Sequence, residues 1–291
     1  MRPDAEHPDQ NAGPDAPRRT LSARCELLRE LIDHAALFPP ASMDMPEAME
    51  ADRVARGGEH AWMLGRFICP ASRLGELPNA APRLSVVLDR GESDLEAVHD
   101  ARLAGRAVEL VEARIDPEWI PDTQELVRAK LGEGVEAFWE LAPGRGLRGS
   151  VAAVREARAG AKIRCGGATA APPVEAVAEF VAACRDAGVR FKATAGLHHA
   201  IRAGDAHGFV NVLAAAVFAH AGGLSADELV PLLAEEDPAA FTVDADALAV
   251  HDHRADTAQI AEARRDLFVA YGSCSFDEPV EDLVALGVLA G

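Results

Sequence analysis

Residues 161–199 read AKIRCGGATAAPPVEAVAEFVAACRDAGVRFKATAGLHH, a pattern that predicts a strand, a helix and a second strand. Short apolar runs at 161–165 and 190–194 each end at a turn that contains glycine. Between them, apolar residues recur at helical spacing after a Pro-Pro pair and before Gly188, residues typical of a helix start and a helix end. A strand–helix–strand unit of this kind joins parallel strands.

Each expected strand carries one lysine, Lys162 and Lys192. Of the 29 basic residues only three are lysines, so arginine is the usual surface cation of this chain. Lysine, unlike arginine, can lose its proton and become a nucleophile. Neighbouring strands lie about 5 Å apart, and two nearby ammonium groups lower each other's pKa, as burial also does. The pair therefore indicates a Schiff-base lysine; the alternative is that each lysine reaches solvent or pairs with a carboxylate.

The alternation of short apolar runs with helical patterns continues on both sides of this unit. Most of the expected strands are separated by one helix, which predicts a (β/α)8 TIM barrel; an open α/β sheet with a helical subdomain is the alternative. The eight expected strands are residues 32–37, 62–69, 84–88, 107–113, 135–141, 161–165, 190–194 and 267–271.

The domain organisation follows from the same pattern. Residues 1–19 lack an apolar period and are expected to be a disordered leader, and residues 20–291 a single barrel domain. Residues 200–266 are expected to be a mostly helical insertion before the last strand, with a capping box, Ser225 with Glu228, at the start of its second helix. Within the insertion, residues 241–253 are expected to be less regular.

Composition narrows the function classes. The chain has 291 residues and a net charge of −18, which argues against nucleic acid and anionic membranes as partners. No apolar run reaches membrane-spanning length, and the five cysteines are dispersed and never in CxxC spacing. We therefore expect a cytoplasmic protein without a disulfide framework or cofactor, acting on a small molecule. The sequence leaves open whether it forms a homo-oligomer.

In a barrel, the site lies at the carboxyl ends of the strands. For Asp89, Arg90 and Arg164, helix capping or ion pairing at the rim is the simpler role, although Arg164 could bind a carboxylate. Glu140 is expected to neutralise a lysine. The side chains predicted at these strand ends are Asp33, His34, Cys69, Asp89, Arg90, Glu109 or Glu112, Glu140, Lys162, Arg164, Lys192, Thr194, His198, His199 and those of residues 272–275.

These residues carry a resemblance to a known family. In their order and spacing, above all that of the two lysines, the chain distantly resembles the deoxyribose-phosphate aldolases, class I aldolases with a (β/α)8 barrel. The resemblance covers about residues 28–198 and resumes at Tyr271. Its carriers are IDHAAL at 32–37 with the following prolines, ICP at 68–70, WE at 139–140, KIRCG at 162–166, KATAG at 192–196 and GSCS at 272–275.

The resemblance implies roles for individual residues. Lys162 would form a Schiff base with a carbonyl substrate, and Lys192 would lower the pKa of Lys162 and share in proton transfer. Asp33 matches an acid of the family's proton relay. The backbone near Gly166, Gly196 and residues 273–275, with Ser273 and Ser275, would hold a substrate phosphate.

The chain also departs from the family. The relay aspartate of the fourth strand falls near Leu110, which leaves Glu109 or Glu112 as stand-ins. The turn after the first lysine is Ile-Arg-Cys-Gly-Gly, and the turn after the second ends in Leu-His-His where the family has an arginine. The resemblance therefore implies that the amine chemistry is kept while the substrate, phosphorylated or carboxylated, differs.

Three other functions compete with the aldolase interpretation. The first is a metal-dependent hydrolase or lyase that uses His198, His199 and His207. Adjacent histidines on an extended segment point to opposite sides, which disfavours joint chelation. The second is a barrel that binds a small ligand without catalysis. The third is a cysteine nucleophile, Cys165 or Cys274, for which the sequence offers no paired base.

Overall fold

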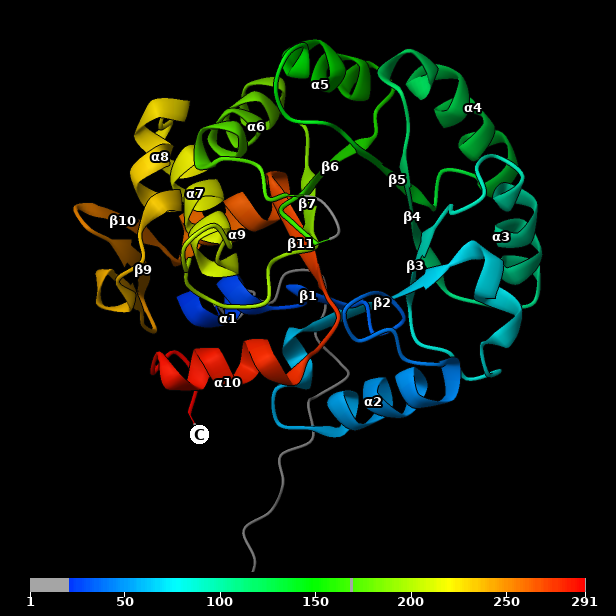
Figure 1. Ribbon diagram of the computed structural model, residues 1–291, viewed down its shortest axis with the longest axis horizontal. Coiled ribbons are helices and arrows are strands. Elements are labelled where there is room, and N and C mark those ends of the chain that lie inside the picture. The colour runs from blue at the N-terminus through cyan, green and yellow to red at the C-terminus, as the bar shows by residue number, and fades with distance from the viewer. Residues whose placement is uncertain (1–20, 168–169, 291) are drawn as a thin grey trace, which may run out of the picture.

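A closed barrel of parallel strands forms the centre of the protein. The computed structural model describes residues 21–167 and 170–290; the predicted leader lies outside the described residues. Within them, the barrel strands follow the order β1-β11-β7-β6-β5-β4-β3-β2 (Figure 1). The predicted (β/α)8 TIM barrel is confirmed, and the open-sheet alternative is wrong. Its strands are β1 (Ile32–His34), β2 (Leu64–Pro70), β3 (Leu84–Val87), β4 (Val108–Arg114), β5 (Glu136–Glu140), β6 (Gly160–Arg164), β7 (Phe191–Thr194) and β11 (Phe268–Ser273).

Helices surround this ring of strands (Figure 1). The connection from β2 to β3 contains a 3-10 helix, Ala71–Glu76, in place of an α-helix. No helix in the described residues has both the length and the apolar character that crossing a membrane requires. The helices outside residues 200–266 are α1 (Ala23–Leu28), α2 (Met45–Gly57), α3 (Asp94–Leu103), α4 (Ile120–Leu131), α5 (Leu147–Glu156), α6 (Val174–Ala187) and α10 (Asp277–Ala285).

The strand–helix–strand unit of β6, α6 and β7 has the predicted form. Helix α6 ends at Gly188, whose φ of 61° is the left-handed conformation that glycine adopts without strain. Strands β6 and β7 are parallel neighbours, and Lys162 is paired in register with Lys192. Because paired residues on adjacent strands point to the same face, both lysine side chains are directed to the same side of the sheet.

The first and last barrel strands differ from their predicted limits. Strand β1 stops at His34: the Ala35 N–H makes the last bond to β11, to the Ser273 carbonyl at 2.6 Å, and the chain then turns, with the Phe38 N–H donating to the Ala35 carbonyl at 2.9 Å. Strand β11 continues to Ser273, two residues beyond the predicted end. Ser273 is thus the last residue of a barrel strand, paired with His34, instead of part of a free turn.

The insertion at residues 200–266 contains helices and a small sheet, on the left in Figure 1. The predicted capping box at Ser225 and Glu228 is present. The expectation of a less regular stretch at 241–253 is wrong, because Asp244 accepts from the N–H groups of Asp246 and Ala247 and closes a tight turn between two short strands. The elements are α7 (Phe209–Gly222), α8 (Ala226–Ala234), α9 (Thr257–Asp266) and the antiparallel strands β8 (Phe241–Val243), β9 (Ala247–Val250) and β10 (His253–Asp256).

Candidate active site

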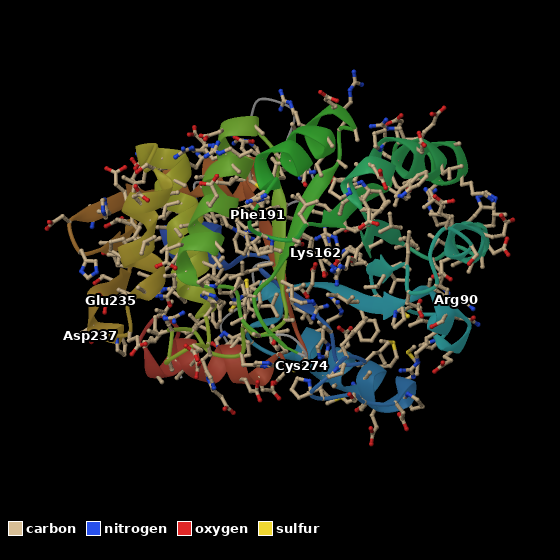
Figure 2. The ribbon with its side chains drawn as sticks, turned by 45° about the horizontal axis from the view of Figure 1, so that its top comes forward. Arg90, Lys162, Phe191, Glu235, Asp237 and Cys274 are labelled. Atoms are coloured by element: carbon tan, nitrogen blue, oxygen red, sulfur yellow. The ribbon has the colours of Figure 1, made fainter. Side chains whose placement is uncertain are left out.

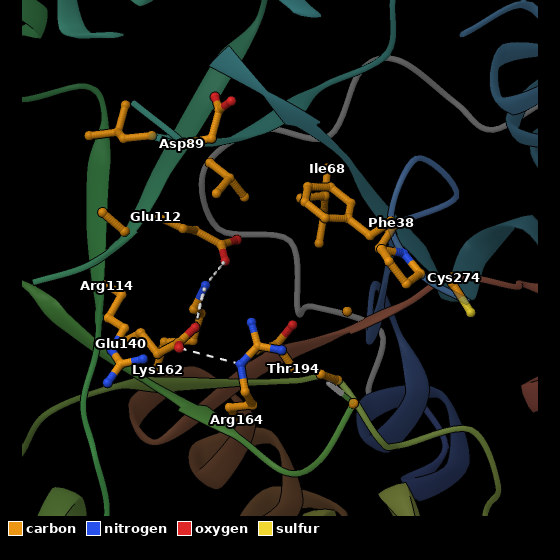
Figure 3. A pocket seen from close by; sticks show the side chains of 18 of the residues that line it. Phe38, Ile68, Asp89, Glu112, Arg114, Glu140, Lys162, Arg164, Thr194 and Cys274 are labelled. Atoms are coloured by element: carbon orange, nitrogen blue, oxygen red, sulfur yellow. Dashed lines mark hydrogen bonds and ion pairs between the residues drawn. The ribbon is translucent and has the colours of Figure 1, made fainter. Parts of the chain in front are cut away.

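A cavity of about 1320 Å³ opens at the carboxyl ends of the barrel strands. Figure 2 shows Lys162 near the middle of the molecule, with Arg90 at its periphery. The cavity has a charged side and an apolar side: Lys162 lies close to Glu112 and Glu140, whereas Phe38 and Ile68 lie across the pocket (Figure 3). A concave pocket with a few converging charged groups is the usual form of a small-molecule site.

Lys162 stands between two carboxylates. Its Nζ donates to Glu112 Oε2 at 3.1 Å and lies 3.2 Å from Glu140 Oε2. The side chain is 6% exposed and lines the cavity, so the amine is shielded from bulk water yet faces the space a ligand would occupy. The expectation that Glu140 neutralises a lysine is confirmed, and Glu112 does so as well.

Lys192 lies beneath this layer and is 1% exposed. Its Nζ donates to Asp33 Oδ2 at 2.6 Å and to Glu112 Oε1 at 2.5 Å. Burial disfavours the ammonium form, but the charges of Asp33 and Glu112 outweigh it and raise the pKa of Lys192. The prediction that the lysine pair lowers the pKa of both members is therefore wrong for Lys192, because its ammonium group contacts two carboxylates, one of which, Glu112, stands between the two cations.

Glu112 connects the two lysines, since one of its oxygens faces Lys162 and the other faces Lys192. Burial opposes its charge, yet the ammonium groups of Lys192 and Lys162, with hydrogen bonds from Lys192 and Ser85, lower the pKa of Glu112. The other predicted stand-in, Glu109, forms ion pairs with Arg66 and Arg83 instead. Of the two glutamates, only Glu112 contacts the lysines.

Asp33 is held from its other side by the start of β2. The Arg66 N–H donates to Asp33 Oδ1 at 2.7 Å. A Cβ at Gly65 would lie 2.4 Å from that same oxygen, so only glycine leaves room for the carboxylate there. The five residues predicted to be catalytic, Asp33, Glu112, Glu140, Lys162 and Lys192, thus form one connected cluster.

The predicted substrate-binding residues divide into two groups. Arg164, Gly196, His198 and Ser273 line the cavity, while Gly166 packs against Gly196. Ser273 Oγ is buried and has no hydrogen-bond partner among the described residues. Ser275 Oγ accepts from the Glu278 N–H at the start of α10, so its hydroxyl caps a helix. Asp89 and Arg90 also have structural partners, the Ser72 N–H and Asp94.

Replacing Gly196 with alanine is expected to loosen this end of the barrel. Gly196 has a φ of 74°, and a Cβ there would lie 2.7 Å from Gly166 Cα and 2.9 Å from the Cys165 carbonyl oxygen. Gly91→Ala is the matched control, because Gly91 has a φ of 85° and open space around it. The control should lose about 1–2 kcal/mol from the left-handed backbone, and Gly196→Ala about 1–3 kcal/mol more from overpacking. Equal urea midpoints for the two variants would contradict the clash.

The histidines of the metal hypothesis have separate partners. His198 Nδ1 lies 3.9 Å from Glu278 Oε2, and His199 Nδ1 lies 3.3 Å from Asp282 Oδ2. The Pro172 carbonyl accepts from buried His207 at 2.7 Å. In the part of the chain that the structure describes, no group of three or more His, Cys, Asp or Glu side chains is arranged to hold a metal ion.

The two cysteines near the mouth differ in their surroundings. Cys165 is fully buried, and desolvation raises the pKa of its thiol to about 12. Cys274 lines the cavity with its Sγ 3.9 Å from His198 Nδ1, a neighbour that the sequence did not reveal. Burial also raises the pKa of the Cys274 thiol. A raised pKa keeps both thiols protonated, which disfavours a nucleophilic role.

Sequence reasoning missed two residues of this site. Ser85 donates to Glu112 Oε1 at 2.5 Å, and Arg114 lines the cavity. Each had a signal: Ser85 is the one hydroxyl in the apolar run 84–88, and Arg114 follows Glu112 by two residues and so faces the same side of its strand.

Comparisons with known proteins give distant likenesses of fold. No protein-family model matches the chain, and no curated protein matches it. Among solved structures, it is similar to a deoxyribose phosphate aldolase from Aeropyrum pernix, with a TM-score of 0.49 and 14% identity over 71% of this chain and 90% of that one. It is also similar to a lysine/ornithine decarboxylase from Vibrio vulnificus, solved with cadaverine, with a TM-score of 0.40 and 12% identity. That match covers 86% of this chain and 58% of the decarboxylase.

Proposed function

We propose that the protein is a lyase of the class I aldolase type, which forms a Schiff base between Lys162 and a small carbonyl substrate. The observation that carries this proposal is the position of Lys162 Nζ, which faces the cavity and lies about 3 Å from Glu112, which anchors it, and from Glu140, which can exchange its proton. A Schiff-base lysine needs this combination of shielding, substrate access and an adjacent proton acceptor.

The chemistry assigns distinct tasks to the charged groups. Lys162 attacks the carbonyl carbon as the neutral amine, after its proton passes to Glu140, and water leaves as the iminium forms. The bond between the α and β carbons then breaks and its electron pair passes to the iminium, which becomes an enamine, while the β-hydroxyl that becomes the product aldehyde gives its proton to a carboxylate. Protonation of the resulting enamine and hydrolysis by water release the second carbonyl product and restore the amine.

Glu112 and Lys192 support these reaction steps from beneath Lys162. Two ammonium groups hold Glu112 in its charged form, so it is a poor proton carrier and a good anchor for Lys162. Glu140 is the better proton carrier because it contacts one lysine where Glu112 contacts two, and it also lines the cavity. Lys192 and Asp33, being buried, keep Glu112 in place and are proposed to position it.

Reductive trapping tests the proposal directly. The protein is incubated with small aldehydes, ketones and 2-oxo acids in the presence of cyanoborohydride, which reduces an iminium to a stable amine. We expect one adduct per chain, located by mass spectrometry on the peptide that contains Lys162. Adducts that appear only on exposed Lys130, or none with any carbonyl, would contradict Schiff-base chemistry and leave the pocket as a site of non-covalent binding.

A further inference from the structure

Two arginines form a second layer above the catalytic cluster. Arg114 follows Glu112 by two residues on β4, and Arg164 follows Lys162 by two residues on β6. Side chains two residues apart on a strand point to the same side. Each arginine therefore lies one step nearer the mouth than its catalytic neighbour, and both line the cavity.

The charges of the two layers differ. In the lower layer, Asp33 and Glu112 balance Lys162 and Lys192. In the upper layer, Glu140 faces two guanidinium groups: its Oε1 lies 3.4 Å from Arg164 Nε, and Arg114 forms no ion pair with any residue that the structure describes. This side of the mouth thus carries one cation more than it has carboxylates, a charge that one substrate carboxylate would balance.

The carboxylates Asp89 and Glu92, which also line the cavity, form no ion pair with Arg114 or Arg164 and have neutral hydrogen-bond donors as partners. Asp89 accepts from the Ser72 N–H at 3.0 Å, and Glu92 accepts from the Thr123 hydroxyl at 3.2 Å. Figure 3 shows Asp89 away from Arg164. Among the described residues, Glu140 is therefore the only carboxylate within ion-pair distance of either arginine.

The spacing of Lys162 and Arg164 fits a carboxylate directly attached to the reacting carbonyl. The single carboxylate of Glu140 already spans these two side chains, with one oxygen 3.2 Å from Lys162 Nζ and the other 3.4 Å from Arg164 Nε. A group of that size bridges the amine and the guanidinium. In a 2-oxo acid, the carboxylate carbon is bonded to the carbonyl carbon that the amine attacks, so the same short span is required.

The rest of the cavity is suited to an apolar substituent. Phe38, Ile68, Trp119 and Leu197 line it, and its volume of about 1320 Å³ far exceeds that of a three-carbon acid. The buried hydroxyl of Ser273, unpartnered among the described residues, lines the cavity and is free to bind a substrate oxygen between the two regions.

We infer that the substrate is a 4-hydroxy-2-oxo acid with an apolar group on C4, its carboxylate bound by Arg114 and Arg164. This inference rests on the proposed Schiff base at Lys162. The amine adds to C2 with loss of water, the C3–C4 bond breaks as the 4-hydroxyl loses its proton, and an apolar aldehyde leaves. Protonation at C3 and hydrolysis release the shorter 2-oxo acid. The reverse reaction would join the same two products.

Binding of a probe that has no carbonyl tests the carboxylate site by itself. We expect phenyllactate to bind the native protein in calorimetry, and Arg164→Gln and Arg114→Gln to weaken it by about 10-fold or more, the usual effect of losing a charge-assisted contact. Arg145→Gln is the matched control, since Arg145 is an exposed arginine after β5 that does not line the cavity. Equal affinities in all variants, or equal binding of the neutral amide of phenyllactate, would overturn the inference.

Trapping separates failure of the inference from failure of the proposed function. With cyanoborohydride, phenylpyruvate should label Lys162 at least about 10-fold faster than phenylacetone, which lacks the carboxylate, and Arg164→Gln should abolish the difference. Equal labelling by both ketones, or a difference between them that persists in Arg164→Gln, would overturn the 2-oxo acid and leave the Schiff base standing. No labelling by any of them, despite arginine-dependent binding of phenyllactate, would overturn the Schiff base and with it the substrate assignment.

Discussion

Lys162→Arg is expected to abolish reductive trapping and to lower the rate of carbon–carbon cleavage by about 10⁴-fold or more, the scale of losing a covalent nucleophile. Arginine keeps the positive charge between Glu112 and Glu140, so the ion pairs that hold the site persist. It has no accessible neutral form and cannot attack a carbonyl. The variant should therefore keep its circular dichroism spectrum and its melting temperature within a few degrees while losing the chemistry.

Because the chain has only three lysines, one substitution, Lys130→Arg, serves as the control. Lys130 is the one lysine outside the site, and it forms an exposed ion pair with Glu96. Lys130→Arg should leave trapping and turnover at wild-type levels. Retention of turnover in Lys162→Arg would remove Lys162 from the mechanism.

Lys192→Met is expected to destabilise the protein by about 3–5 kcal/mol, the usual cost of breaking a buried ion pair by removing one partner. The substitution removes the nearer of the two cations that contact Asp33, leaving only Arg66 at 3.8 Å, and it leaves Glu112 with only Lys162. Urea unfolding measures the loss. Lys130→Met, which breaks an exposed ion pair, should cost less than about 1 kcal/mol. The difference between the two variants therefore measures the effect of burying the ion pair.

A second substitution tests whether the lost stability comes from the buried carboxylate of Asp33, which then has only the longer ion pair with Arg66. Asp33→Asn in the Lys192→Met background removes that charge and should recover part of the loss, giving a favourable coupling between the two positions. If the double variant is as unstable as the sum of the single ones, the effect of Lys192→Met arises from packing and not from charge.

The stability difference between the native protein and Lys192→Met should also depend on pH. The pKa of Lys192 is raised in the folded state from an ordinary value of 10.5, so its contribution is complete below that pH and is lost as pH rises through the folded pKa. Urea midpoints of the two proteins should therefore converge above about pH 10.5. The pKa of Glu112 is lowered from 4.5, so its contribution is lost on the acid side, below about pH 4.5.

Local patterns were enough to predict the architecture and to single out the two lysines. Apolar runs of strand length and helical periodicity act between near neighbours in the chain, so the eight strands could be recognised without knowing their partners. The excess of arginine identified Lys162 and Lys192, and the β6–α6–β7 unit placed them side by side. The same reasoning could not choose between Glu109 and Glu112, because both precede the end of one strand.

Only the tertiary structure decided how the charges are paired. Asp33 and Glu112 lie 159 and 80 positions from Lys192 in the sequence, and closure of the barrel brings both carboxylates to one ammonium group. The stagger between strands sets which side chains share a layer, and no local pattern encodes that stagger. The sequence thus determined that two lysines lie side by side on neighbouring strands of a barrel. The fold determined that Glu112 separates them and, with Asp33, keeps the buried lysine charged, and it leaves Lys162 facing the cavity.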